Sequence, residues 1–297
     1  MKITERQRKD NIAGYIFLLP FLIGLFTFTL YPFISSLYLS FTDYDLLSDA
    51  KWIGLSNYLQ MFTIDEKFWI SFKVTVKFAV VQVPLKLAFA LFVAIILARK
   101  TKLTNIYRAA FYIPSLLGGG VAVAITWRRL WGSDGVINSL LNRIGIPSVN
   151  WLTGTKTALY VLILLGVWQF GSQMLIFLAA IKDVPHSLHE AAIMDGAGPI
   201  TRFFKVTLPM ITPAMFYNLV RGIIGAMQAF NSAYLVTSGG PLNSTLYYGL
   251  YQYRQAFEFR HMGYASAMAW FLMLVIVALT ALVFKSSSGW VYYQDEM

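Results

Sequence analysis

The sequence has no cysteine and little charge, and each shortage excludes a class of protein. Without cysteine the chain has no disulfide framework, no thiolate metal site and no thioether link to haem. Charged residues make up 13 % of the chain, whereas water-soluble domains usually carry about 25 %. Hydrophobic residues make up 57 %, and they occur in blocks long enough to cross a bilayer. The sequence is therefore that of a polytopic membrane protein.

Six apolar runs are long enough to cross the membrane as helices. At about 1.5 Å per residue, each run exceeds the roughly 30 Å of bilayer hydrocarbon. The first run is longer than the apolar core of a secretory signal and lacks a cleavage site, so we expect it to be retained. We predict an all-α membrane domain over residues 12–284, with spans at about 12–40, 71–98, 105–127, 157–181, 208–236 and 262–284.

Lysine and arginine predict how the spans are oriented. The net charge of +10 comes mainly from basic residues at the ends of apolar runs, which indicates membrane topology and lipid contact and not nucleic-acid binding. The bias is strongest around the first two spans and favours a cytoplasmic N-terminus. We therefore expect segments 1–11 and 285–297 in the cytoplasm, and loops 41–70, 128–156 and 237–261 outside.

The cytoplasmic loop 182–207 has the signals of a helix–turn–helix. Asp183 is suited to be an N-cap, with Pro185 in the first turn, and Gly196 or Gly198 can end the helix in a left-handed conformation. A second short helix is expected over 201–206. From the residues alone, the segment is either an amphipathic loop on the membrane surface or a rigid element on which a soluble partner docks.

The same segment carries a family resemblance. Its Glu-Ala-Ala, Asp-Gly-Ala and Leu-Pro groups resemble, at full spacing, the loop of bacterial ABC importer permeases that contacts the ATPase subunit. The resemblance implies a type I ABC importer permease fold, with 184–206 as the coupling segment. The residues that it assigns to coupling are Glu190, Ala191, Ala192, Asp195, Gly196 and Ala197.

Motifs elsewhere in the chain extend the resemblance to nearly its full length. They resemble the MalF-like carbohydrate branch of these permeases, without that protein's large periplasmic insertion or its two extra N-terminal spans. The motifs are Tyr31-Pro32, Ser40-Phe41-Thr42-Asp43, Ser238-Gly239-Gly240-Pro241, Ala256-Phe257 and Gly263-Tyr264-Ala265-Ser266-Ala267.

The resemblance also implies partners and a mechanism. The chain would sit in a bacterial cell membrane as half of a heterodimer with a homologous second permease. Two ABC ATPase subunits would bind ATP and Mg, and an extracytoplasmic solute-binding protein would deliver an oligosaccharide. This chain would bind no cofactor and would move its substrate by alternating access.

The residues give no catalytic or metal-binding set. No acidic residue lies inside a predicted span, and the chain has no phosphate-cradling glycine loop. Asp43 and Asp45 lie two residues apart on an outer loop, where a solvated turn explains them better than a metal or glycosyl-transfer site. His186 and His189 are predicted inside and His261 outside. A membrane-embedded glycosyltransferase is the alternative from another function class.

Basic residues inside the spans suggest the substrate. Lys73 and Lys77 are close enough to the outer end of the second span to reach the headgroups. Lys86 and Arg221 lie deeper, where an unpaired cation costs about 2.5–3.5 kcal/mol. Arg221 offers a fork suited to a carboxylate or phosphate. The alternative is that Arg221 pairs with a carbonyl or with an acidic residue of the second permease.

The fifth span is the one that lines the path in maltose-type relatives. The residues that we expect to contact substrate are Arg221, Gln228, Phe230 and Asn231, with Lys86 from the second span and Trp168 from the fourth. Trp168 belongs to an aromatic–amide cluster with Gln169 and Gln173 that is equally suited to core packing. Our hypothesis is an oligosaccharide containing uronic acid. A neutral sugar or another small solute such as glycerol phosphate is the alternative.

Overall fold

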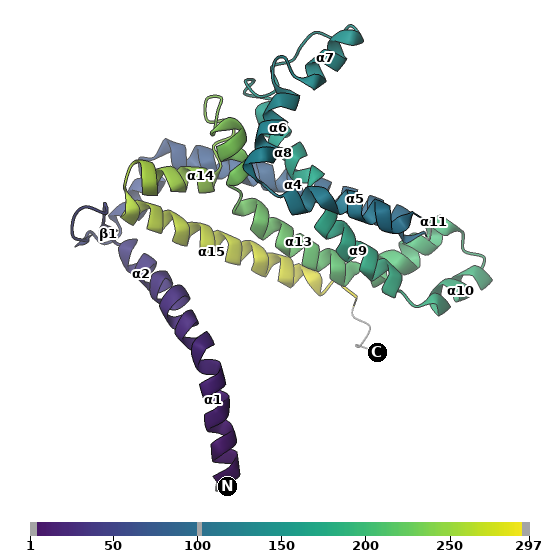
Figure 1. The fold of residues 1–297 in the computed structure, drawn as a ribbon, viewed down its shortest axis with the longest axis horizontal. Coiled ribbons are helices and arrows are strands. Elements are labelled where there is room, and N and C mark those ends of the chain that lie inside the picture. The colour runs from purple at the N-terminus through teal and green to yellow at the C-terminus, as the bar shows by residue number, and fades with distance from the viewer. Residues whose placement is uncertain (1–4, 100–102, 293–297) are drawn as a thin grey trace. The chain divides into compact units, whose positions relative to one another are not determined.

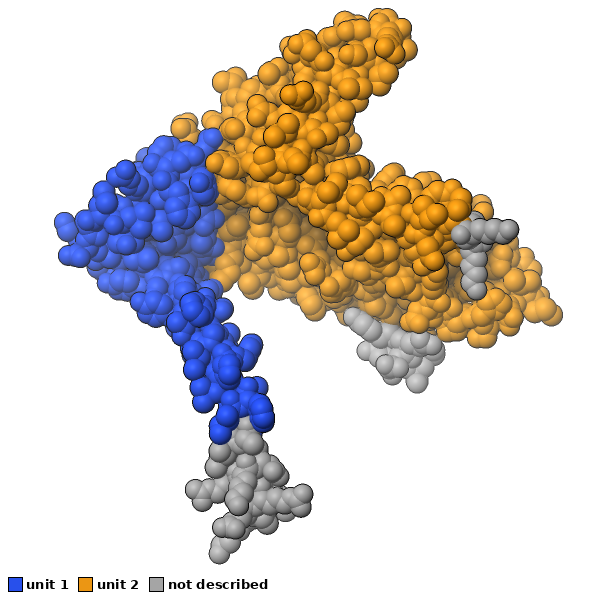
Figure 2. All heavy atoms as spheres, in the orientation of Figure 1, with its two compact units in different colours: residues 1–65, 252–271 blue, residues 66–251, 272–297 orange. Residues whose placement is uncertain are grey.

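Helices form most of the chain in the computed structural model, which describes residues 5–99 and 103–292, with side chains from residue 14 onward (Figure 1). Residues 1–4 of the predicted N-terminal segment and 293–297 of the predicted tail lie outside the described residues. So do Lys2, Lys100 and Lys102. The described chain divides into two compact units, residues 1–65 with 252–271 and residues 66–251 with 272–297 (Figure 2).

Unit 1 contains the first predicted span. Helix α1 (Glu5–Leu25), a π-helical stretch (Phe26–Leu30) and α2 (Tyr31–Leu39) follow one another without a break. Residues Gly14–Leu39 of this run are long and apolar enough to cross a membrane, close to the predicted span 12–40. Strands β1 (Thr42–Asp43) and β2 (Lys51–Trp52) then form a small antiparallel hairpin, a departure from the all-α prediction, and α3 (Ser56–Thr63) ends the segment.

Two of the motifs that carried the family resemblance in unit 1, around Ser40 and around Gly263, are held by hydrogen bonds to residues of the segment 40–65. The buried Asn57 amide donates to the carbonyls of Ser40 and Thr42, each at 2.9 Å. The Gly263 backbone N–H donates to the Tyr44 carbonyl at 3.0 Å. The Tyr264 hydroxyl donates to an Asp65 carboxylate oxygen at 2.6 Å. The segment after the first span and the start of the last are thus joined by hydrogen bonds.

Unit 2 holds most of the remaining helices. In chain order they are α4 (Glu66–Ala98), α5 (Thr104–Leu117), α6 (Val121–Trp131), α7 (Val136–Arg143), α8 (Ala158–Trp168), α9 (Gly171–Asp183), α10 (His186–Met194), α11 (Pro199–Arg202), a π-helical stretch (Phe203–Thr207), α12 (Leu208–Met210), α13 (Thr212–Met227) and a second π-helical stretch (Ala233–Thr237). Helix α14 (Tyr248–Tyr253) crosses from unit 2 into unit 1, where a π-helical stretch (Arg254–Glu258) follows, and α15 (Met262–Ser287) begins in unit 1 and ends in unit 2.

The core of unit 2 lies between α4 and α9. One face of α4 presents small and branched side chains, and α9 fills the spaces between them with larger ones. The buried cluster consists of Ala90, Val93, Ala94, Leu97, Phe170, Met174, Phe177 and Leu178. Because the α4 residues recur at three- and four-residue intervals, they form one continuous stripe along the helix. This packing holds α4 and α9 together beside α13.

Only three helical runs within the described residues are long and apolar enough to span a membrane, and the number rises to five if each of two bent pairs counts as one span. The three are Gly14–Leu39, Glu66–Ala98 and Met262–Ser287. The predicted run 105–127 is not one helix, because α5 and the α6–α7 segment meet at 101°. The predicted run 157–181 bends by 43° between α8 and α9. The predicted run 208–236 is interrupted after Met227.

Three consecutive glycines explain the sharpest bend. Gly118 has φ +58°, a conformation that side-chain-bearing residues rarely adopt. A Cβ atom on Gly119 would lie 3.1 Å from the Asn231 Cβ, so this turn packs closely on the interrupted segment after α13. Gly120 is extended and begins α6. Hydropathy and length alone do not register such a turn, which is why the sequence predicted a continuous helix.

Candidate functional site

A cavity of about 540 Å³ lies among the helices of unit 2. Its walls come from α4, from the junction of α8 and α9, from α13 and the break after it, and from the glycine turn between α5 and α6. The lining residues are Phe78, Gln82, Val83, Lys86, Leu87, Gly119, Leu165, Gly166, Gln169, Gln173, Arg221, Gly222, Gly225, Ala226, Gln228, Ala229, Phe230, Asn231 and Ser232. We call it the central cavity.

Five of the six residues predicted to contact substrate line this cavity. Lys86 comes from α4 and Arg221 from α13, whereas Gln228, Phe230 and Asn231 come from the break that follows α13. The break turns these three side chains out of the regular helical arrangement that the sequence predicted. Backbone that leaves a helix at membrane depth is tolerated where it lines a cavity. The break in the fifth predicted span therefore forms part of the wall of the cavity.

Two cations and no carboxylate occur among the residues that line the central cavity. Arg221 Nη1 donates to the Tyr217 hydroxyl at 3.3 Å, and its guanidinium lies 5.9 Å from the centre of the same ring. The guanidinium has five N–H donors, so this contact leaves most of them for another acceptor. Lys86 is half-buried on the α4 wall.

Glutamine amides provide the uncharged polar surface of the cavity. Gln169 Nε2 donates to the Gly118 carbonyl at 2.8 Å, which ties the α8–α9 junction to the glycine turn. Gln173 Oε1 is buried and accepts no hydrogen bond from the described part of the chain. Gln82 is also buried and packs against Gly166, where an added Cβ would meet its amide nitrogen at 2.9 Å. Gln82 is not among the predicted site residues, although its place four residues before Lys86 puts both on one helix face.

Trp168 lies outside the central cavity. It lines a separate, mainly apolar hollow together with Trp127, and the two ring centres are 5.8 Å apart. Trp127 Nε1 donates to the Val161 carbonyl at 3.1 Å, which fixes α6 against α8. The packing role that the sequence left open for Trp168 therefore agrees with its position.

The predicted coupling segment forms two short helices, α10 and α11. The helix begins later than predicted: Asp183 is the last residue of α9, and Pro185 with its extended backbone is the N-cap of α10. The predicted glycine stop is confirmed at Gly196, which has φ +75°. The N–H of Gly196 donates to the Ile193 carbonyl and that of Ala197 to the Ala192 carbonyl, each at 2.9 Å. These two bonds form a complete Schellman motif.

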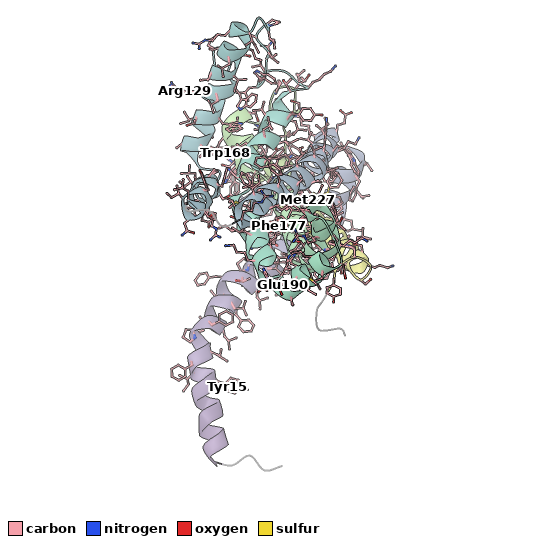
Figure 3. The ribbon with its side chains drawn as sticks, turned by 90° about the vertical axis from the view of Figure 1, so that its right-hand side faces the viewer. Tyr15, Arg129, Trp168, Phe177, Glu190 and Met227 are labelled. Atoms are coloured by element: carbon pink, nitrogen blue, oxygen red, sulfur yellow. The ribbon has the colours of Figure 1, made fainter. Side chains whose placement is uncertain are left out.

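The surface of this segment is exposed and partly apolar. Met194 is 87 % exposed and Ile200 75 %, and Leu188, Ile193 and Phe204 are exposed with them. Glu190 and Ala191 are exposed on α10, where His186 Nδ1 lies 3.0 Å from Glu190 Oε1. Asp195 and Gly196 are exposed after the helix, and Ala192 and Ala197 are half-buried. Glu190 lies toward the opposite end of unit 2 from Arg129 on α6 (Figure 3).

The paired aspartates of the 41–70 loop belong to the small hairpin, with Asp43 on β1 and Asp45 in the turn that follows. Asp45 Oδ1 accepts hydrogen bonds from the Ser48 hydroxyl and N–H, each at 2.8 Å, and from the Leu47 N–H at 3.0 Å. The Ser48 hydroxyl and the backbone donors lower the pKa of the Asp45 carboxyl. No group of three or more His, Asp or Glu residues that could hold a metal ion occurs in 5–99 or 103–292.

Comparisons with known proteins assign the family. Residues 86–295 match the model of the binding-protein-dependent transport system inner membrane component. The chain is 52 % identical to the probable ABC transporter permease protein YesP of Bacillus subtilis, over all of this chain and 97 % of that protein. It is 32 % identical to the arabinooligosaccharides transport system permease protein AraP of the same organism, over 93 % and 89 % of the two chains.

A solved structure gives the same fold. A chain of a bacterial alginate ABC transporter in complex with alginate pentasaccharide-bound periplasmic protein has a TM-score of 0.85 at 21 % identity, covering 96 % of this chain and 97 % of that one. The fold is thus that of a type I ABC permease, and permease subunits are not themselves enzymes. The chain belongs to the family of binding-protein-dependent transport system inner membrane components.

Proposed function

We propose that this chain is a permease subunit of an ATP-driven importer for oligosaccharides that contain uronic acid. The observation that carries the proposal is the central cavity, where Lys86 and Arg221 line the wall and no carboxylate joins them. Cations at membrane depth cost about 2.5–3.5 kcal/mol each on insertion scales. An acidic substrate offsets this cost each time it binds, so the cavity selects for a carboxylate.

The oligosaccharide class is supported by relatives and by the cavity wall. AraP is named for arabinooligosaccharides, and other relatives are named for lactose and for trehalose and maltose. Phe230 offers an apolar surface to one face of a sugar ring. The lining also includes Gln169, Gln173 and Gln228, and amide groups can exchange hydrogen bonds with sugar hydroxyls. Arg221 then has the geometry to hold a carboxylate through two parallel N–H bonds.

The coupling segment supports the ATP-driven part of the proposal. Helix α10 and the residues after it present Met194, Ile193 and Ile200 to the outside of the unit, a surface suited to a docking partner. We propose that Glu190, Ala191, Ala192, Asp195, Gly196 and Ala197 contact an ABC ATPase subunit there. The ATPase would bind ATP and Mg. Closure of the ATPase dimer would move segment 184–206 and switch the path between inward- and outward-facing states.

The same proposal includes the assembly and its orientation. The chain would pair with a second, homologous permease in the cell membrane, two ATPase subunits would bind inside, and a solute-binding protein would bind outside. Its domain would cover 12–284 with six spans, three of them bent or interrupted, and segments 1–11 and 285–297 would be cytoplasmic. The opposite positions of Arg129 and Glu190 in unit 2 agree with an outer α6–α7 region and an inner α10 (Figure 3).

Charge-removing variants in the central cavity test the substrate class. We expect Arg221→Gln to raise the KM for uptake of a trimeric uronate by about tenfold or more, because hydrogen bonds to charged groups contribute about 1.5–3 kcal/mol. Lys86→Gln should act in the same direction. The measurement is uptake into proteoliposomes that contain the complete transporter, with trimeric uronates and matched neutral trimers as substrates.

Lys77→Gln is the matched control for Lys86→Gln. Lys77 lies on the same helix, outside the central cavity, with its ammonium 5.4 Å from the centre of the Tyr160 ring. Its variant should leave the KM unchanged. If the cavity variants raise the KM equally for acidic and neutral trimers, the result contradicts an acidic substrate and favours a neutral sugar. If the transporter takes up glycerol phosphate and neither trimer, its substrate is another small solute and not an oligosaccharide.

A further inference from the structure

A second cavity, of about 490 Å³, lies where the C-terminal end of α6 meets the turn after the second π-helical stretch of unit 2. Apart from Val236, at the end of the fifth predicted span, its lining residues belong to the predicted outer loops 128–156 and 237–261. We call it the outer cavity. Its lining residues are Arg128, Trp131, Gly132, Ser133, Asn150, Trp151, Leu152, Thr153, Val236, Thr237, Gly240 and Pro241.

We propose that the outer cavity is a second carbohydrate subsite, which holds one sugar ring of the transported oligosaccharide against Trp131 and Trp151. The inference rests on the proposed function, because it takes the substrate to be an oligosaccharide. The cavity has the volume of a small-molecule pocket, and its wall combines aromatic rings with a few polar groups, as such pockets do.

The aromatic wall suits the apolar face of a sugar. The Trp131 and Trp151 rings have centres 5.2 Å apart and planes at 78°, so they form two sides of a corner. A sugar ring that lies in this corner packs its C–H groups against the carbon atoms of the two indole rings. Arg128 stands one turn before Trp131 on α6 and donates N–H bonds to oxygen atoms at the edge of the ring.

One buried side chain fixes the two loops of this wall. Asn138 is 1 % exposed, and its Nδ2 lies 3.0–3.2 Å from the carbonyl oxygens of Gly132, Ser133 and Val149. Its Oδ1 accepts from the Val149 N–H and from Trp151 Nε1, each at 3.0 Å. The Trp151 ring is thus held by its edge, with its position set before any ligand binds. Such preorganisation lowers the entropy that binding would cost.

The opposite wall is also held in place. Thr245 Oγ1 donates to the Gly240 carbonyl at 2.6 Å and lies 2.7 Å from Thr237 Oγ1. The same stretch of chain reaches the central cavity, because residues 228–232 line the central cavity, and Val236, Thr237, Gly240 and Pro241 line the outer one. This continuity favours a segment of the same oligosaccharide as the occupant, over a side chain of the solute-binding protein.

Paired variants of the complete transporter in nanodiscs test the subsite. The probes are a tetrameric uronate and the matched neutral tetramer, and the readouts are the Kd of each probe and, separately, the Kd of the sugar-free binding protein. Trp131→Leu should raise the Kd of the transported tetramer about tenfold, equivalent to about 1.4 kcal/mol. Trp131→Phe, which keeps an aromatic face, should raise it less. Arg128→Gln should also raise the Kd of the tetramer. Arg129→Gln, which changes a residue outside the cavity, should leave this Kd unchanged.

The outcomes separate this subsite from the proposed function. Wild-type transporter that binds and transports neither tetramer contradicts the proposed function itself. If the wild-type transporter binds a tetramer, and Trp131→Leu and Arg128→Gln bind it as tightly as Arg129→Gln does, the outer subsite alone is overturned. An unchanged tetramer Kd together with weaker docking of the sugar-free binding protein also overturns it and assigns the cavity to a protein contact.

Discussion

At the residue scale, Gly222 is one of two glycines around the central cavity that allow close helix contacts. A Cβ atom there would lie 2.9 Å from Val83 Cγ1, and a valine side chain has little rotational freedom in a helix. We expect Gly222→Ala to push α13 away from α4 and to destabilise the protein by about 1–3 kcal/mol through overpacking. The measurement is the thermal unfolding midpoint of the purified transporter, which should fall.

Gly225 provides the control for this substitution. It lines the same cavity three residues later, and a Cβ atom there would meet nothing within 4 Å. Gly225→Ala should therefore keep or slightly raise the midpoint, because alanine favours a helix over glycine. An equal loss of stability in both variants would show that glycine is needed along the whole helix, and would contradict the specific contact with Val83.

Both cations of the central cavity were predictable at this scale, because charge is conspicuous in an apolar run. Lys86 and Arg221 stood out for that reason, and Gln228, Phe230 and Asn231 followed from the family resemblance. Trp168 was chosen by residue type and proximity in sequence, and it lines a separate hollow with Trp127, although its neighbours Gly166 and Gln169 line the central cavity. Gln82 is polar but uncharged, so it did not stand out, although its helical spacing from Lys86 could have identified it.

At the element scale, Gly196 determines how α10 ends. Its φ of +75° costs a residue with a Cβ about 1–2 kcal/mol. We expect Gly196→Ala to loosen the Schellman motif, so that the amides near the end of α10 exchange their hydrogens about fivefold faster or more. Uptake should fall as well, since the proposed coupling depends on a rigid α10. Hydrogen exchange and ATP-driven uptake measure the two effects.

Gly198 is the matched position for that experiment. It has an extended backbone, and a Cβ atom there would meet nothing within 4 Å. Gly198→Ala should therefore change neither hydrogen exchange nor uptake. If Gly196→Ala accelerates exchange but leaves uptake at the wild-type level, α10 is not the rigid coupling element that we propose.

Helix identity was predictable at this scale, whereas helix continuity was not. The runs 105–127, 157–181 and 208–236 are apolar enough to read as single spans. The first turns at Gly118, which needs a positive φ, and the last breaks after Met227 so that Gln228 and Asn231 can line a cavity. Hydropathy reports how much apolar surface a segment has and does not report where its backbone changes direction.

At the scale of the whole molecule, the proposed orientation can be tested with single thiols. The chain has no cysteine, so any introduced cysteine is the chain's sole thiol. Thr155 in the loop before α8 and Ser187 on α10 are both exposed. We expect an impermeant maleimide added outside intact cells to label Thr155→Cys and not Ser187→Cys. Both variants should react after permeabilisation, and labelling of Ser187→Cys in intact cells would reverse the proposed topology.

The family was predictable from the whole sequence, because many short motifs occur in the right order. In unit 1 the structure gives a physical reason for some of them: Gly263 and Tyr264, at the start of the last span, are hydrogen-bonded to Tyr44 and Asp65 in the segment that follows the first span. The outer cavity was not predictable, since its two walls lie about a hundred residues apart in sequence. Its central organiser, Asn138, is an ordinary polar residue on the short helix α7, and nothing in the sequence distinguishes it.

The segment 228–241 limits how this transporter could be redesigned. One end of it lines the central cavity and the other lines the outer cavity. A mutation that reshapes the segment for a new cargo at one end therefore displaces the wall at the other. Engineering a different specificity will require both cavities to be varied in one library, because substitutions selected separately at each cavity will not combine additively.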